Sequence, residues 1–95
     1  MEWEWDTYKS EDNAEKLGVT FEEATEVFDD PDALDVPDET HSEEEDRRIV
    51  IGATMSLRLV LVVYTMRGAT RRLISARATT WRERERIRQR DEGDE

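Results

Sequence analysis

The stretch that decides the fold is residues 57–77, which read LRLVLVVYT, MRGA and TRRLISAR. Two runs rich in apolar and β-branched residues flank a short connection that contains Gly68, which is the pattern of an antiparallel hairpin. Pairing Thr65 with Thr70 across a four-residue turn divides the side chains between two faces. One face is apolar, with Leu59, Leu61, Val63, Arg72, Ile74 and Ala76. The other face carries Val60, Val62, Tyr64, Arg58, Arg71, Leu73, Ser75 and Arg77.

On the second face, arginine, serine and tyrosine side chains lie among valine and leucine side chains. Cationic side chains gathered on one surface favour an anionic ligand. The alternative is that these arginines only solvate an exposed face of the sheet, as charged residues commonly do.

Length and composition restrict the class of protein. The chain has 95 residues and no cysteine, so a single domain over residues 1–90 is expected, without disulfides or thiolate metal sites. Residues 91–95 are expected to form a disordered acidic tail. The amino terminus does not have the pattern of a secretory signal, and the longest apolar run, Leu59 to Val63, is too short to span a bilayer. A cytoplasmic protein without a membrane partner is therefore predicted.

The net charge of −11 is divided unevenly along the chain. Residues 1–46 hold 19 acidic side chains and two lysines, whereas residues 47–95 hold 12 arginines and six acidic side chains. Such asymmetry points to an interaction surface in the basic half, which contains the hairpin. The acidic excess is also typical of adaptation to high salt, so the overall charge does not exclude a local anion site.

The remaining elements follow from capping and periodicity. A short strand is predicted near the amino terminus, at residues 2–5. Asp6 and Gly18 bound a helix over residues 7–17, and Thr20 with Glu23 forms a capping box that opens a second helix at residue 21. An edge strand at 33–36, a strand at 49–53 and a helix from Trp81 to about residue 90 complete an α+β fold. This fold is a small antiparallel sheet with two N-terminal helices and a C-terminal helix.

Two groups outside the hairpin are candidates for chemistry. Lys9 lies near Asn13 and Lys16 on one side of the first helix, where it either forms local ion pairs or contacts a phosphate. His41, the only histidine, lies beside a run of acids that ends at Asp46. One imidazole with unspaced carboxylates is a poor metal-ligand set, so proton transfer with Glu45 is favoured over metal binding, and a solvated acidic loop is the alternative.

The order of these residues resembles one known family, the BrnT toxins. The resemblance is collinear from Trp5 to Glu83 and rests on combined order and spacing. The matching positions are Trp5-Asp6, Lys9, Asn13, Lys16, Gly18-Val19, Phe21, Ala24, Val27-Phe28, Asp30-Pro31, His41-Ser42, Glu45, Arg47, Ile51-Gly52, Val62 to Thr65, Arg67-Gly68, Ile74 to Arg77 and Arg82-Glu83.

The resemblance implies the toxin of a type II toxin–antitoxin pair, with a RelE-like fold and a ribonuclease activity that arrests translation. It also implies a BrnA-like antitoxin that covers the toxin, with DNA bound only indirectly through that antitoxin. On this basis we expect cleavage of an RNA substrate by attack of the ribose 2′-hydroxyl, with no cofactor and no metal. The expected catalytic residues are His41, Glu45, Arg47 and Arg77, and the expected RNA-binding residues are Lys9, Arg58, Tyr64, Arg67 and Arg71.

This chain departs from the family pattern at two positions. Leu17 stands where the family usually has histidine, and Ala78 stands where it usually has lysine. These departures raise an alternative, in which the chain is a weakened or inactive toxin homologue that acts as an antitoxin-binding co-repressor subunit.

Overall fold

The computed structural model describes residues 2–39 and 46–93. Its elements are β1 (Glu2–Glu4), α1 (Thr7–Leu17), α2 (Phe21–Thr25), the 3-10 helix η1 (Glu26–Asp29), β2 (Leu34–Pro37), β3 (Arg47–Ala53), β4 (Leu59–Arg67), β5 (Thr70–Ala78) and α3 (Trp81–Gly93). The strands form one sheet in the order β1-β5-β4-β3-β2. Neighbouring strands are antiparallel except β1 and β5, which are parallel. The α+β class and the edge position of β2 are thus confirmed, and the predicted antiparallel sheet includes one parallel pair, β1 with β5.

The central hairpin of β4 and β5 is confirmed, but its register differs from the predicted one. Arg67 pairs with Thr70, so the connection is the two-residue turn of Gly68 and Ala69. The predicted pairing of Thr65 with Thr70 is therefore wrong. Because the turn has two residues and not the predicted four, Met66 and Arg67 also belong to the paired part of the hairpin.

A β-bulge then changes the faces of β5. Tyr64 pairs with Leu73 but Val63 pairs with Ser75, which leaves Ile74 as one extra residue in β5. Side chains alternate between faces with a period of two, so one extra residue moves everything beyond it to the opposite face. Ser75 and Arg77 consequently lie on the face of Val63, and not on that of Tyr64 as predicted.

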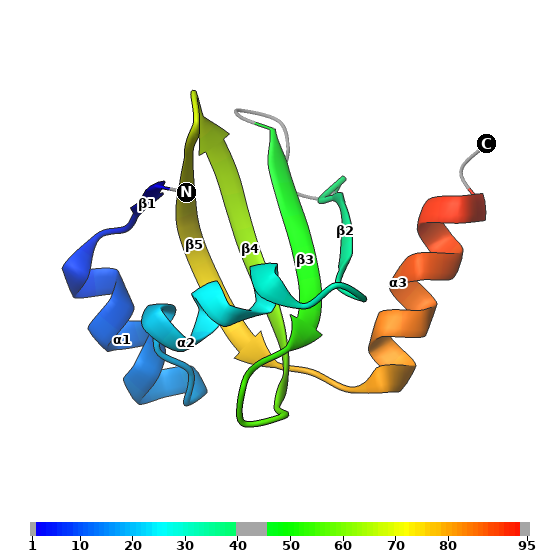
Figure 1. Ribbon diagram of the computed structural model, residues 1–95, viewed down its shortest axis with the longest axis horizontal. Helices are drawn as coiled ribbons and strands as arrows, with labels where there is room; N and C mark the ends of the chain where they lie inside the picture. The colour runs from blue at the N-terminus through cyan, green and yellow to red at the C-terminus, as the bar shows by residue number, and fades with distance from the viewer. Residues whose placement is uncertain (1, 40–45, 94–95) are drawn as a thin grey trace.

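One face of the sheet forms the main core, beneath α1, α2 and η1 (Figure 1). Its buried side chains come from both the sheet and the helices: Val50, Val60, Val62, Tyr64, Leu73 and Ala76 lie beneath Val19, Phe21, Ala24 and Val27. A Cβ on Gly52 would stand 3.0 Å from Val27 Cγ1 and 3.1 Å from Ala33 Cβ. Glycine is therefore needed in β3, because η1 and the segment before β2 approach it closely.

The predicted starts of the three helices and the predicted end of α1 are confirmed by their caps. Asp6 accepts hydrogen bonds from the backbone of Tyr8 at 2.8 Å and Lys9 at 3.3 Å, and Gly18 ends α1 with φ 75°. Thr20 and Thr80 cap α2 and α3 by accepting from the amides three residues later, at 3.0 and 3.1 Å. Because α3 continues to Gly93, the expected disordered tail does not begin at residue 91.

Polar side chains attach α1 to the sheet. Tyr8 and Leu17 are exposed, and the buried residues of the helix are instead Ser10 and Asn13. The Asn13 amide donates to the carbonyls of Val19 and Ala76, both at 2.8 Å, and accepts from Ala76 N at 3.1 Å. The free edge of β5 offers backbone groups, so the polar side chain of Asn13 can attach this helix to the sheet.

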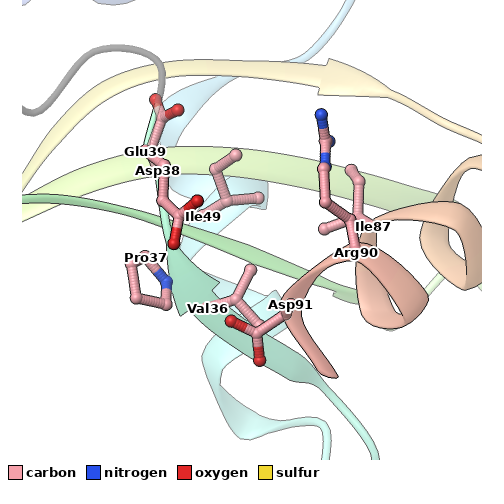
Figure 2. Close-up of a pocket in the computed structure, with 8 residues that line it drawn as sticks. All are labelled: Val36, Pro37, Asp38, Glu39, Ile49, Ile87, Arg90 and Asp91. Atoms are coloured by element: carbon pink, nitrogen blue, oxygen red, sulfur yellow. The ribbon is translucent and has the colours of Figure 1, made fainter. Parts of the chain in front are cut away.

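The second face of the sheet is covered mainly toward β2, where α3 packs (Figure 1). Ile87 of α3 joins Val36, Ile51 and Leu61 in a smaller apolar cluster. A cavity of about 210 Å³ lies beside this contact. Figure 2 shows residues that line it, among them Arg90, Ile87, Val36 and Ile49. Within residues 2–39 and 46–93, no helix has the length and apolar character needed to cross a bilayer.

Candidate functional site

The second sheet face carries a row of polar residues that crosses three strands. Arg47 of β3 pairs with Thr65 of β4, and Thr65 pairs with Arg72 of β5. Paired residues share a face, and neighbouring strands are about 4.8 Å apart, so the Cα atoms of the two arginines are roughly 10 Å apart. The Thr65 side chain between them is buried and donates to the carbonyl of Asp46 at 3.0 Å.

Arg77 extends this row along β5. It pairs with Leu61, which belongs to the apolar cluster under α3, so it shares the face of Arg47 and Arg72. Four strand steps, allowing for the bulge, separate it from Arg72 by about 13 Å. Arg67 pairs with Thr70 at the tip of the hairpin on the same face. We call the face that carries Arg47, Arg67, Arg72 and Arg77 the arginine face.

Three arginines of this face form ion pairs with carboxylates. Arg77 donates from both terminal nitrogens to Glu83 of α3, at 2.8 and 2.7 Å, and Arg72 forms an ion pair with Glu4 of β1. Arg67 stands 3.5 Å from the same Glu4 carboxylate. These ion pairs fix the guanidinium groups in place while leaving part of each exposed, with 44% of the Arg77 side chain accessible.

The Arg77–Glu83 contact has a clear electrostatic consequence. The hydrogen bonds from Arg77, and then from Thr79, lower the pKa of Glu83 to about 2. The same Glu83 hydrogen bonds raise the pKa of Arg77. Both groups therefore stay charged at neutral pH, and an incoming phosphate would compete with Glu83 for this guanidinium.

Tyr64 and Arg71, both predicted to bind RNA, lie on the other, helix-covered face. Tyr64 is 3% exposed and donates from its hydroxyl to Asp35 at 2.6 Å. Burial, with that hydrogen bond, raises its pKa to about 12. The Arg71 guanidinium lies 4.4 Å from the ring centre of Phe28 and 5.3 Å from that of Trp3. The prediction that they join Arg77 on one face is wrong, because the bulge lies between them and Arg77.

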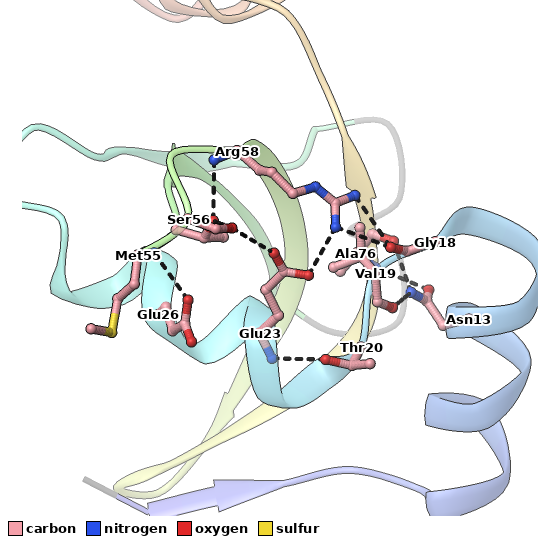
Figure 3. Close-up of polar contacts among 11 residues, drawn as sticks. Asn13, Gly18, Val19, Thr20, Glu23, Glu26, Met55, Ser56, Arg58 and Ala76 are labelled. Carbon is pink, nitrogen blue, oxygen red and sulfur yellow. Dashed lines mark hydrogen bonds and ion pairs between the residues drawn. The ribbon is translucent and has the colours of Figure 1, made fainter.

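Arg58 also has a structural position, as Figure 3 shows. It donates to the Gly18 carbonyl from two nitrogens, both at 3.2 Å, and to Glu23 at 3.0 Å. It thereby ties the loop before β4 to the end of α1 and to α2. Its predicted place beside Arg77 is wrong, since these contacts direct it to the helix-covered side.

Three further predicted site residues lie away from the arginine row or cannot be placed. Lys9 is exposed on α1, near the free edge of β5. His41 and Glu45 lie outside the described residues. Sequence reasoning missed Arg72, which takes part in the row, because an apolar partner was assigned to it. Its place opposite Thr65 is visible only once the two-residue turn is known.

The comparisons with known proteins bear on this arrangement. A family model described as "Ribonuclease toxin, BrnT, of type II toxin-antitoxin system" matches residues 5–83. The chain belongs to the BrnT toxin family. The match covers every strand except β1, and it ends at Glu83, the carboxylate that binds Arg77. A type II system pairs a toxin with an antitoxin protein, so a protein partner is implied.

The fold has a counterpart among solved structures. The crystal structure of the Brucella abortus ribonuclease toxin BrnT superposes with a TM-score of 0.66 and 24% identity, covering 84% of this chain and 97% of that chain. At this identity the likeness shows a BrnT fold. A search of curated proteins finds no match.

Proposed function

We propose that this BrnT family member is an active endoribonuclease whose RNA-binding surface is the arginine face. The single observation that carries the proposal is the convergence of Arg47, Arg72 and Arg77 from β3 and β5 on a surface that α3 covers only toward β2. Arginine is the preferred ligand of phosphate because its planar donors match two phosphate oxygens. Three such groups on one face suit an RNA backbone.

The reaction that fits these groups is attack of the ribose 2′-hydroxyl on the adjoining phosphorus. A bond forms between the 2′-oxygen and phosphorus, the bond to the 5′-oxygen breaks, and the products are a 2′,3′-cyclic phosphate and a free 5′-hydroxyl. The 2′-hydroxyl proton passes to a base and the leaving oxygen takes a proton from an acid. We assign these proton transfers to His41 and Glu45 on sequence grounds, and the developing negative charge to Arg47 and Arg77.

Loss of Arg77 should remove transition-state stabilisation with little loss of stability. Removing one preorganised donor to a developing anion typically lowers kcat by about 10²- to 10³-fold. We expect Arg77→Ala to fall in that range and Arg77→Lys to retain an intermediate activity, since lysine keeps the charge but loses the paired donors. Single-turnover cleavage of a labelled RNA, with the product ends identified, measures this effect.

The control for that experiment is Arg86→Ala, which removes an exposed arginine of α3 and should leave cleavage unchanged. Thermal unfolding of each variant separates lost activity from lost folding. EDTA should have no effect on the wild type. Wild-type rates in both Arg77→Ala and an Arg47→Ala/Arg77→Ala variant, or a requirement for added divalent metal, would contradict this mechanism.

The antitoxin we expect is a BrnA-like protein that covers the arginine face and carries the DNA contact. Arg67 and Arg77 are more than 40% exposed, so this surface is open to a protein as well as to RNA. Expression of the toxin alone should arrest growth and generate cut RNA, and co-expression with the neighbouring antitoxin should relieve both effects.

A second function is favoured by one specific feature. The cations at Arg72 and Arg77 are already bound by Glu4 and Glu83, and Leu17 replaces a histidine that could transfer protons. A chain with these features can act as an antitoxin-binding co-repressor without cutting RNA. Intact RNA and normal growth on expression of the toxin alone, together with tight antitoxin binding, would identify this function.

A further inference from the structure

A groove lies between α1 and the part of β5 that β1 does not reach. Its volume is about 300 Å³, and its lining comprises Lys9, Asp12, Asn13, Lys16, Leu17, Ile74 and Ser75. The chain contains only two lysines, and both line this groove. In a chain of net charge −11, such a concentration of ammonium groups creates a local site for an anion.

The bulge in β5 joins this groove to the arginine face. As the extra residue, Ile74 lines the groove beside α1, while Ser75 pairs with Val63 on the arginine face. Ser75 therefore belongs to both surfaces, and it stands between Arg72 and Arg77 in the sequence of β5. A strand bound across the arginine face can continue around the edge of β5 into the groove.

The two ammonium groups are available to a ligand. That of Lys9 has no ion pair or hydrogen bond within residues 2–39 and 46–93. Lys16 lies 3.2 Å from Asp12, but the two side chains are 71% and 52% exposed, and such surface pairs contribute little. A phosphate can displace Asp12 from Lys16 without exposing a buried charge.

The other walls define what else can bind. Both amide hydrogens of Asn13 are used by the carbonyls of Val19 and Ala76, so this residue is a fixed wall and not a ligand-binding group. Leu17 and Ile74 present apolar surface, against which the flat face of a base can pack. The Ser75 hydroxyl adds a hydrogen-bonding group at the end nearest the arginine face.

From this arrangement we propose that the groove binds one nucleotide of single-stranded RNA next to the cleaved bond. Lys9 and Lys16 hold its phosphate, and its base packs on Leu17 and Ile74. This inference rests on the proposed ribonuclease function, because it extends the same RNA path beyond the arginines. It also gives the family position occupied by Leu17 a binding role that does not require a histidine.

The test is a binding series with RNA that cannot be cleaved. Oligonucleotides blocked as 2′-O-methyl ethers are lengthened by one nucleotide at a time from either end, and their affinity for the full chain is measured by fluorescence anisotropy. For the wild type, one particular added nucleotide should produce a step in affinity. Lys9→Gln/Lys16→Gln should abolish that step, while Leu17→Ser should reduce it.

The matched control is Arg86→Gln/Arg90→Gln, which removes the same two charges from exposed positions on α3, at the opposite end of the molecule from α1 (Figure 1). Affinity decreases as salt increases, and this dependence should become weaker in the lysine variants. The magnitude of the slope of log affinity against log salt should decrease by about 0.7 for Lys9→Gln and about 1.4 for the double lysine variant. The control variant should keep the affinity step.

The possible outcomes separate this site from the ribonuclease proposal. Cleavage of ordinary RNA by the wild type, with both double variants giving the same steps and slopes, overturns the groove and leaves the activity standing. A lysine-dependent step without any cleavage supports the groove and overturns the activity. Absence of RNA binding by the wild type overturns both.

Discussion

The two faces of the sheet use arginine in opposite ways. On the helix-covered face, Arg71 packs over Trp3 and Phe28. The ring centre of Phe28 lies 4.9 Å from that of Trp3 and 4.9 Å from that of Tyr64, so the three rings form an aromatic cluster. On the arginine face, the adjacent residue Arg72 is bound only by a partly exposed carboxylate. Neighbours in the sequence thus have different roles, because alternation in a strand sends one to the core and the other to the surface.

Neither the number of arginines nor their position in the sequence indicates whether they pack in the core or can bind a ligand. An arginine whose plane lies over aromatic rings is part of the packing, whereas one whose donors meet exposed acids can exchange them for a phosphate. Stability should therefore depend on the helix-covered face and activity on the arginine face.

The largest effect is expected in the main core. Phe21 is fully buried in α2, so Phe21→Ala should lower the free energy of unfolding by about 3–5 kcal/mol. Val63→Ala on the arginine face should lower it by only about 1 kcal/mol, since Val63 is half-buried. Urea unfolding measures both free energies. An equal loss for the two variants would show that the two faces of the sheet contribute equally to stability.

The neighbouring pair Arg71 and Arg72 gives the most direct comparison of the faces. Arg72→Ala should reduce RNA cleavage at least about tenfold, with little change in stability. Arg71→Ala should leave cleavage per folded molecule unchanged and lower stability by about 1 kcal/mol, through lost cation–π contacts. Cleavage rates and thermal melts on the same samples measure the two effects, and the reverse pattern would place the RNA on the wrong face.

The smallest effects concern pH, and the two faces should respond at opposite ends of the scale. The folded-state pKa of Glu83 is lowered to about 2, so the stability it contributes is present above its ordinary value of 4.5 and is lost as pH falls toward 2. Tyr64 has a folded-state pKa raised to about 12, so its contribution is present below pH 10 and is lost as pH rises toward 12.

Variants separate those two limbs of the pH profile. Glu83→Gln should flatten the acid limb by less than about 1 kcal/mol, because its partner Arg77 is partly exposed and screened by solvent. Tyr64→Phe should flatten the alkaline limb and leave the acid limb unchanged. Chemical unfolding across the pH range shows this, and a Glu83→Gln profile identical to that of the wild type would mean that the ion pair does not contribute to folding.

Local signals allowed much of the fold to be predicted from the sequence. Asp6, Thr20 and Thr80 mark helix starts through hydrogen bonds made within three residues, so their positions do not depend on the rest of the chain. The bulge at Ile74 has no such local mark, because it depends on how β5 fits between β4 and α1. Arg47, Arg67 and Arg77 were all predicted site residues and lie on one face, but the sequence prediction put Arg77 on the face of Arg58, Tyr64 and Arg71 because it did not foresee the bulge.

The side chain of Asn13 has a consequence for association between molecules. By bonding both backbone groups of Ala76, it occupies the positions where another chain would pair with the open half of β5. In the edge strand β2, Pro37 has no amide hydrogen to donate to an incoming strand. Pairing with a strand of another molecule is thereby hindered at the open half of β5 and at Pro37 of β2, which favours binding of partners through the side-chain faces of the sheet.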